Sequence, residues 1–232
     1  MNISIVIPTL NEVKNIETVV MGALAFSDEV IVVDGGSTDG TREIAKNLNV
    51  KLVETKQKGK GSALKIGVNI ASNEIIVFMD ADCSHDPKDI PKLIDPIVSR
   101  DIDHVFGSRV TGGSDELSGN IDQCLRLIGS TIITLCINLR FNTSYSDSQN
   151  GYRAIKKSVF KSLSLKETKT TIEQEMMIKT LAKGLSLEEI PSHEYARTNG
   201  VSKISLYRDS FRYLFSLFYY LTESFFRNKH IK

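Results

Sequence analysis

Residues 75–87, IIVFMDADCSHDP, pass from a run of apolar side chains to three acids and a histidine. The apolar half predicts a buried β-strand, at whose end Asp80 and Asp82 follow. Two carboxylates at positions i and i+2 of an extended chain point to the same side. Because like charges held this close repel, one takes up a proton unless a cation lies between them. Carboxylate oxygens suit Mg2+ or Mn2+, which also bind substrate phosphates. The stretch therefore predicts a metal site at a strand end.

The same alternation of strand and helix runs through the first hundred residues. Apolar runs predict strands at 3–8, 29–34, 50–55 and 74–80. Continuous apolar strands separated by helices are typical of an α/β fold with a mostly parallel central sheet and helices on both faces. Ligands bind such sheets beyond the carboxyl ends of the strands. We therefore expect the polar segments at 9–12, 34–37 and 80–82 to form one site.

From residue 104 this rhythm breaks. An apolar run at 104–109 precedes an amphipathic helix predicted over 121–141, and a polar loop follows at 142–153. A helix at 171–184 and a strand at 187–191 come next. No linker, internal repeat or low-complexity segment interrupts the chain. We expect one domain over residues 1–205 and a C-terminal extension over 206–232.

The bulk composition excludes several classes of protein. The 232 residues carry a net charge of only +1, which gives no reason to expect binding to nucleic acid. The three cysteines are odd in number and form no CxxC pair, as is typical of reduced thiols in a cytoplasmic protein. The chain begins with the strand-like ISIVIP rather than a leader, and no apolar run approaches the ~20 residues that span a bilayer. We expect a soluble or peripheral cytoplasmic protein.

The motif VDGGSTDGT (33–41) follows one strand and opens a helix. Asp34 is placed to accept hydrogen bonds from the N–H edge of a base, and the two glycines permit a tight turn beside the ligand. Asp39 is more typical of a helix N-cap. Neither a GxGxxG fingerprint nor a P-loop is present, which disfavours hydride transfer and P-loop chemistry. Together with the metal site, the motif predicts binding of a nucleoside diphosphate.

Two further segments leave alternatives open. KQKGKGSAL (56–64) places lysines and glycines before a helix N-terminus, which suits either a phosphate-binding loop or solvated lysines. His85 is either a further metal ligand or a structural residue, whereas Asp86 before Pro87 predicts a helix N-cap. The cysteines and four histidines lack the spacing of a zinc site.

Taken together, the motifs resemble family 2 glycosyltransferases of the GT-A fold. PTLNE, DGGSTDGT, KGKGSAL, DADCSHDP, GSR, DSQNGYR and RTNGVSK occur in the family order across residues 1–205. They are most similar to dolichyl-phosphate mannose synthases and other polyprenyl-phosphate glycosyltransferases. The resemblance implies an inverting transfer, dependent on Mg2+ or Mn2+, of one sugar from a GDP- or UDP-linked donor to dolichyl or polyprenyl phosphate. Mannose is the leading expectation, with glucose or N-acetylglucosamine open.

The resemblance also implies roles for individual residues. The expected donor-binding residues are Pro8, Leu10, Glu12, Asp34, Lys60, Asp80, Ala81, Arg197 and Lys203, with Asp80 and Asp82 as the metal ligands. Arg109, Arg126 and Ser130 are expected to hold the acceptor phosphate, and Asp82, Asp147 and Arg109 to serve catalysis. A phosphate acceptor is already ionised near pH 7, so we expect Asp147 to orient groups rather than to take a proton. Glu175 resembles a similarly placed family acid, with a solvated helix face as the alternative.

General chemistry supports two of these assignments. Arg126 and Ser130 are four residues apart on a predicted helix, hence on one face, and an Arg/Ser pair suits an anion. Arg197 and Lys203 flank Gly200 in a polar loop, as is typical of a lid.

The chain also departs from the mannose synthases at two places. Ser84 stands where they usually have Gln, so water would replace one metal ligand. DSQNGYR is closer to relatives that use glucose or N-acetylhexosamine donors.

The C-terminal extension is aromatic and basic. Nine of the 17 aromatic residues lie between positions 207 and 226, and residues 203–232 hold six Lys or Arg against two Asp or Glu. Such an amphipathic helix is expected to lie in a membrane interface, at the cytoplasmic face. The alternatives are packing on its own domain or on a second copy in a homodimer.

Two other functions stay open at this point. The first is a glycosyltransferase of the same fold with a glycan or protein acceptor, for which Asp147 would be an essential base. The second is a nucleotide-sugar-binding module without turnover. A nucleotidyltransferase is disfavoured because no Gly-rich, Arg-containing loop follows ISIVIP.

Overall fold

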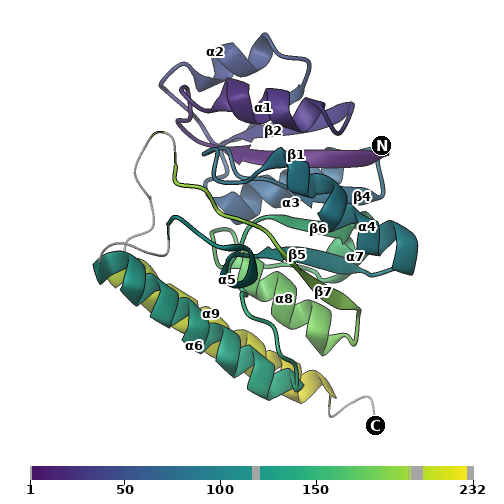
Figure 1. Ribbon diagram of the computed structural model, residues 1–232, viewed down its shortest axis with the longest axis vertical. Helices are drawn as coiled ribbons and strands as arrows, with labels where there is room; N and C mark the ends of the chain where they lie inside the picture. The colour runs from purple at the N-terminus through teal and green to yellow at the C-terminus, as the bar shows by residue number, and fades with distance from the viewer. Residues whose placement is uncertain (1, 117–120, 198, 200–205, 229–232) are drawn as a thin grey trace.

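Seven strands form one sheet in the computed structural model, which describes residues 2–116, 121–197, 199 and 206–228 (Figure 1). The strands are β1 Ile3–Thr9, β2 Glu29–Asp34, β3 Lys51–Glu54, β4 Ile75–Phe78, β5 His104–Ser108, β6 Arg153–Lys156 and β7 Leu187–Pro191. Their order is β3-β2-β1-β4-β6-β5-β7. Only β6 runs antiparallel to its neighbours, β4 and β5, within this sheet. The expected mostly parallel sheet is confirmed.

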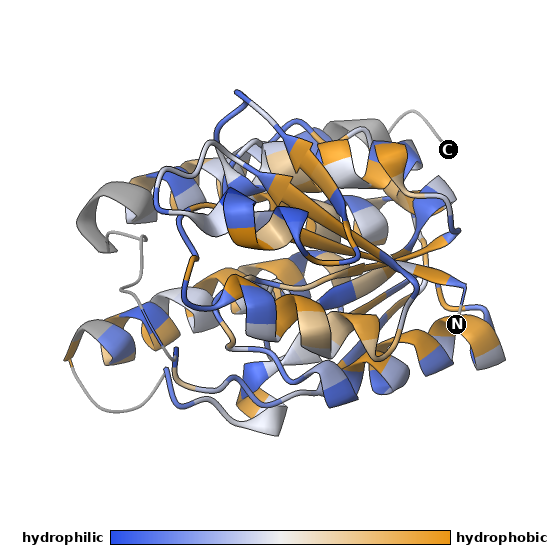
Figure 2. Ribbon diagram, turned by 90° about the horizontal axis from the view of Figure 1, so that it is seen from above, coloured by the Kyte–Doolittle hydropathy of each residue, from blue (hydrophilic) through white to orange (hydrophobic). Residues whose placement is uncertain are grey.

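Helices cover both faces of this sheet. They are α1 Ile16–Leu24, α2 Thr41–Lys46, α3 Lys60–Ile70, α4 Ile90–Arg100, α5 Arg109–Gly112, α6 Ile121–Phe141, α7 Lys157–Ser162, α8 Ile172–Ala182 and α9 Leu206–Asn228, with a 3-10 turn at Pro87–Asp89. One core cluster packs α1 and α4 on one face, and a second packs α3, α7 and α8 on the other. Figure 2 shows the apolar strands lying between these helical layers. Burial on both faces explains why β1 and β2 are apolar almost throughout.

Strand β6 is the main element that the sequence did not predict. It has four residues, RAIK, of which only the middle two are apolar. It pairs with β4 and β5, so its partners come from distant segments. Arg153 is fully buried, where its guanidinium donates to the carbonyls of Asn150 and Ser148 and lies 5.3 Å from the ring of Phe106. An arginine in a core strand breaks the apolar pattern on which strand prediction depends.

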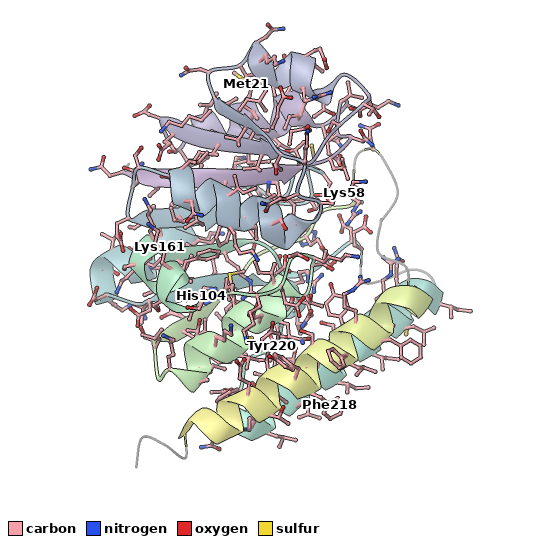
Figure 3. All side chains as sticks on the ribbon, turned by 180° about the vertical axis from the view of Figure 1, so that it is seen from behind. Met21, Lys58, His104, Lys161, Phe218 and Tyr220 are labelled. Carbon is pink, nitrogen blue, oxygen red and sulfur yellow. The ribbon has the colours of Figure 1, made fainter. Side chains whose placement is uncertain are left out.

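The long helices α6 and α9 lie side by side along one edge of the molecule (Figures 1 and 3). A third core cluster joins them to β5 and α8 through residues such as Ile137 and Leu217. Within the described chain, α6 is long and apolar enough over Gln123–Phe141 to cross a membrane, judged by length and composition alone. This corrects the expectation that no segment approaches that length. Arg126 and Arg140 place two charges within this span.

Candidate functional site

Asp80 and Asp82 follow β4 at the carboxyl edge of the sheet, as the sequence predicted. Ser84 fixes Asp82, since its hydroxyl and its backbone N–H donate to Asp82 Oδ1 at 2.6 and 3.2 Å. Asp82 Oδ2 faces Arg197, whose Nε lies 3.1 Å away. This contact is one of charge rather than a hydrogen bond, because Nε finds no hydrogen-bond acceptor among the described residues. Ser84 thus orients the carboxylate of Asp82 through Oδ1, and Oδ2 of the same carboxylate faces the site.

The structure gives His85 a supporting role. Its Nδ1 accepts the backbone N–H of Asp80 at 3.2 Å, and its ring stacks on Tyr152 with the centroids 4.5 Å apart. Asp86 accepts the backbone N–H of Lys88 and caps the following turn, as predicted. His85 therefore holds the backbone behind the acid pair, and Ala81 is buried between the two acids.

Lys60 reaches into the same site from the start of α3. Its Nζ lies 2.6 Å from Asp80 Oδ1 and 2.8 Å from Glu173 Oε1. Burial lowers the pKa of Lys60, but the two carboxylates outweigh it and raise the pKa above its usual value. Burial likewise raises the pKa of Asp80, yet Lys60 outweighs it and the net pKa is lowered. Both groups are charged at neutral pH.

The glycines around Lys60 serve close packing. Gly59 has φ +107° and, like Gly61, lies against the backbone of residues 167–169, where a Cβ would collide. The carbonyl of Thr168 also accepts the backbone N–H of Ser62 at 3.1 Å. Lys56 and Lys58, which precede Gly59, are both exposed to solvent. The segment is therefore a packed turn that directs one lysine inward.

These residues fit a hard divalent cation bound in part by a substrate. The described residues contain no group of three or more His, Cys, Asp or Glu side chains that would cage a metal alone. Asp80 and Asp82 offer carboxylate oxygens, and the cations Lys60 and Arg197 now lie against them. Two carboxylates with waters and phosphates suit Mg2+ or Mn2+.

Asp34 lies at the end of β2, buried. Its Oδ1 accepts the backbone N–H groups of Gly36 and Ser37 at 3.0 and 2.9 Å, and the Ser37 hydroxyl donates to Oδ2. Arg42 Nε is 3.7 Å from Oδ1. The Asp34 carboxylate therefore stabilises the turn at Gly35 and Gly36. A nucleobase bound by Asp34 would have to use oxygens that already accept these hydrogen bonds.

A hollow of about 240 Å³ opens beside this turn. It is lined by Asn11, Glu12, Val13, Lys14, Asn15, Asp39 and Asn199. Glu12 accepts a hydrogen bond from Asn15 at 2.9 Å, and Asn199 donates to Asn15 Oδ1 at 3.1 Å. Of the other predicted contacts in this region, Pro8 is half-buried in β1 and Leu10 is exposed beyond its end.

Arg197 and Asn199 thus contact the acid pair and the hollow respectively. Lys203, the other lid residue predicted from sequence, lies outside the described residues.

Arg109 and Asp147 form a second charged centre. Arg109 donates from Nε and Nη2 to the two oxygens of Asp147 at 2.6 and 3.1 Å, and Nη1 lies 3.5 Å from Glu194. Burial raises the pKa of Asp147, but the guanidinium outweighs it and lowers the pKa below its usual value. Asp147 is therefore ionised and holds Arg109 in place.

The structure links Arg126 and Ser130 to this centre through α6. Both side chains are half-buried on the helix. Thr134, one turn beyond Ser130 on the same face, donates to Ser148 Oγ at 2.8 Å, and Ser148 follows Asp147 in the chain. The row Arg126, Ser130, Thr134 therefore leads along α6 toward the Asp147 loop.

Sequence reasoning missed Glu173. The acid that it singled out, Glu175, is buried against Lys179 at 2.7 Å and accepts the backbone N–H groups of Lys166 and Glu167. Glu175 therefore stabilises the α8 region. Glu173, two residues earlier, lies on another face of α8 and contacts Lys60. Helical periodicity was the available signal, because positions i and i+2 of a helix lie on different faces, so that only one of the two acids can face the site.

Comparisons with known proteins identify relatives in sequence and in fold. The family model of glycosyl transferase family 2 matches residues 4–164. The hexosyltransferase Agl6 of low-salt glycan biosynthesis in Haloferax volcanii is 28% identical over 217 residues, covering 91% of this chain and 52% of Agl6. A dolichol-phosphate mannosyltransferase of Pyrococcus furiosus is 35% identical over 215 residues, covering 88% of this chain and 59% of the relative. The chain thus spans between half and two thirds of these relatives' lengths.

A solved structure shows the same fold. Glucosyl-3-phosphoglycerate synthase from Mycobacterium tuberculosis, in complex with Mn2+, UDP-glucose and phosphoglyceric acid, superposes with a TM-score of 0.77. The match covers 95% of this chain and 80% of the synthase, at 23% identity.

Proposed function

The chain belongs to glycosyl transferase family 2, and from this membership we propose that it transfers one sugar from a GDP- or UDP-linked donor to dolichyl or another polyprenyl phosphate. Mannose is the leading sugar, because the mannosyltransferase of Pyrococcus furiosus is 35% identical. Glucose and N-acetylglucosamine remain the alternatives on account of the DSQNGYR segment.

One observation supports the proposal of a lipid acceptor. Helix α6 bears Arg126 and Ser130, the proposed phosphate-binding pair, and also a row of exposed apolar side chains. The row is Ile121, Leu125, Ile128, Ile132, Leu135 and Leu139, each between 46% and 79% exposed. Their spacing of three and four residues places them on one face of the helix. A phosphate site and an apolar surface on a single helix suit an acceptor that joins a phosphate to a long hydrocarbon.

Helix α9 extends this surface. Phe211, Leu214, Phe215, Phe218 and Tyr219 are exposed beside α6. In Figure 3, Phe218 points away from the domain whereas Tyr220 points toward it, and Lys179 Nζ lies 5.3 Å from the Tyr220 ring. We call the eleven exposed residues of the two helices the α6–α9 face. We propose that this face rests on the cytoplasmic surface of a membrane, as the aromatic, basic C-terminal segment suggests.

The donor would bind along the carboxyl edge of the sheet. The hollow beside Glu12 and Asp39 would take the nucleoside, and Asp80 and Asp82 would hold Mg2+ or Mn2+ next to the diphosphate. Such a cation neutralises negative charge that develops on the leaving diphosphate. Arg197 and Lys60 would add positive charge there. The Mn2+ complex of the mycobacterial synthase supports a divalent cation in this fold.

Arg109, held by Asp147, would position the acceptor phosphate together with Arg126 and Ser130. An oxygen of the phosphate attacks the anomeric carbon from the side opposite the nucleotide, so the configuration inverts. The bond from that carbon to the diphosphate oxygen breaks, and the nucleoside diphosphate leaves with the electron pair. A phosphate monoester carries its negative charge near pH 7, so no base is required. Catalysis then depends on position and electrostatics.

The test is transfer from radiolabelled GDP- and UDP-sugars to dolichyl phosphate with Mg2+ or Mn2+, and with EDTA as the control. We expect one donor to give a labelled lipid that EDTA abolishes. Donor binding without a lipid product from any donor would overturn the lipid acceptor and favour a glycan or protein.

A further inference from the structure

Lys60 lies between two carboxylates that come from different parts of the fold. Its Nζ is 2.6 Å from Asp80 Oδ1 and 2.8 Å from Glu173 Oε1. Asp80 follows β4, whereas Glu173 is in the first turn of α8 and is 2% exposed. Gly151 leaves room for the ammonium, since a Cβ there would lie 2.3 Å from Lys60 Nζ.

Asp80 and Glu173 differ in their binding partners other than Lys60. Asp80 belongs to the proposed metal site, and a cation bound there would compete with the Lys60 ammonium for its oxygens. Glu173 Oε2 is buried and has no hydrogen-bond partner within the described part of the chain. A buried carboxylate oxygen without a donor is costly, so this atom is an available acceptor for Lys60.

These contacts point to an exchange of partners. We propose that Glu173 is a positioning residue that keeps Lys60 in the site when the divalent cation takes over Asp80. Lys60 then turns its hydrogen bonds onto both oxygens of Glu173 and remains beside the donor diphosphate. This inference deepens the proposed function, because it rests on metal binding at Asp80.

The contrasting explanation is that Glu173 only adds a negative charge near the metal. The two accounts differ for the double variant Lys60→Met/Glu173→Gln. If only net charge matters, removing one positive and one negative charge leaves Mn2+ affinity close to that of the wild type. If Glu173 acts through Lys60, the double variant has lost the competing cation and binds Mn2+ more tightly.

The experiment measures Mn2+ dissociation constants by electron paramagnetic resonance, with GDP or UDP present to supply the diphosphate and without sugar donor or acceptor. We expect Glu173→Gln to weaken Mn2+ binding about tenfold, because Lys60 then has only Asp80, and one charge-assisted hydrogen bond is of that size. Lys60→Met and the double variant should both bind more tightly than the wild type. Glu175→Gln is the matched control, since it changes a buried glutamate of the same helix that pairs with Lys179. It should leave Mn2+ affinity unchanged.

A crystal structure of the wild type with Mn2+ gives a readout that does not depend on how well the variants fold. We expect Lys60 Nζ on Glu173 and no longer on Asp80. Lys60 still paired with Asp80, or a double variant with wild-type affinity, would overturn the inference while leaving the proposed function intact. A wild type that binds no Mn2+ would overturn both the inference and the metal site. Loss of lipid transfer alone would bear only on the acceptor.

Discussion

Replacing Asp147 by Asn removes the charge that holds Arg109 and should cost about 3 kcal/mol in free energy of unfolding. The side chains of Asp147 and Arg109 are only 1% and 14% exposed. Removing one partner of a buried ion pair costs about 3–5 kcal/mol because the other charge stays buried. The lower end of this range applies here, since Glu194 still lies 3.5 Å from Arg109 Nη1 and the Asn carbonyl still accepts one hydrogen bond.

Urea denaturation at pH 7 measures this loss directly. A loss of about 3 kcal/mol corresponds to a melting temperature lower by about 6–12 °C for a chain of this size. The pKa of Asp147 is lowered in the folded state, so its contribution is present above the unfolded pKa and is lost as the pH falls through the folded pKa. The difference between variant and wild type should therefore shrink below about pH 4. A loss under about 1 kcal/mol at pH 7, the level of an exposed pair, would refute the buried ion pair.

Three further predictions concern separate parts of the molecule. Gly151→Ala should lower the transfer rate by about tenfold and also lower the melting temperature, because a Cβ 2.3 Å from Lys60 Nζ displaces the ammonium from the buried Asp80 and Glu173 carboxylates; an unchanged rate would argue against a role for Lys60. Phe218→Glu should reduce sedimentation with anionic lipid vesicles. Met21, which is 56% exposed, lies at the opposite end of the molecule, so Met21→Glu should leave sedimentation unchanged (Figure 3). Equal sedimentation of the two variants, or a dimer disrupted by Phe218→Glu in lipid-free solution, would contradict membrane docking. Burial raises the pKa of Glu29, but Lys51 and nearby hydrogen bonds outweigh it and lower the pKa to about 2. Stability from Glu29 is thus present above its unfolded pKa of 4.5 and lost as the pH falls through about 2, so Glu29→Gln should destabilise by roughly 1–2 kcal/mol at pH 7 and by only a few tenths of a kcal/mol at pH 2; a constant difference across this range would be contrary evidence.

Local patterns in the sequence predicted the first half of the fold well. The runs at 3–8, 29–34 and 74–80 correspond to β1, β2 and β4, because strands buried on both faces need continuous apolar residues. The position of β6 between β4 and β5 was not predictable in this way. Its pairing depends on segments far apart in the chain, and Arg153 hides its buried character.

The residues of the candidate site likewise differ in how far the sequence predicts their positions. Asp80, Asp82 and Asp34 follow strands, so the general rule for parallel sheets locates them from sequence alone. The inward turn of Lys60 depends instead on Gly151 and Glu173, which the fold brings to it from about a hundred residues away. The sequence of α8 also offers two acids, and only the packing of the helix determines which of them faces the site.

The most direct test of the central claim is the KM for dolichyl phosphate in lipid vesicles, measured for the wild type and for Arg126→Ala with the donor that the panel identifies. If α6 binds the lipid phosphate, the KM for dolichyl phosphate should rise about tenfold or more, with the KM for the donor unchanged, because one charge-assisted contact to the phosphate is lost. An unchanged KM for dolichyl phosphate, with equally fast transfer to a water-soluble acceptor, would contradict a polyprenyl phosphate as the acceptor.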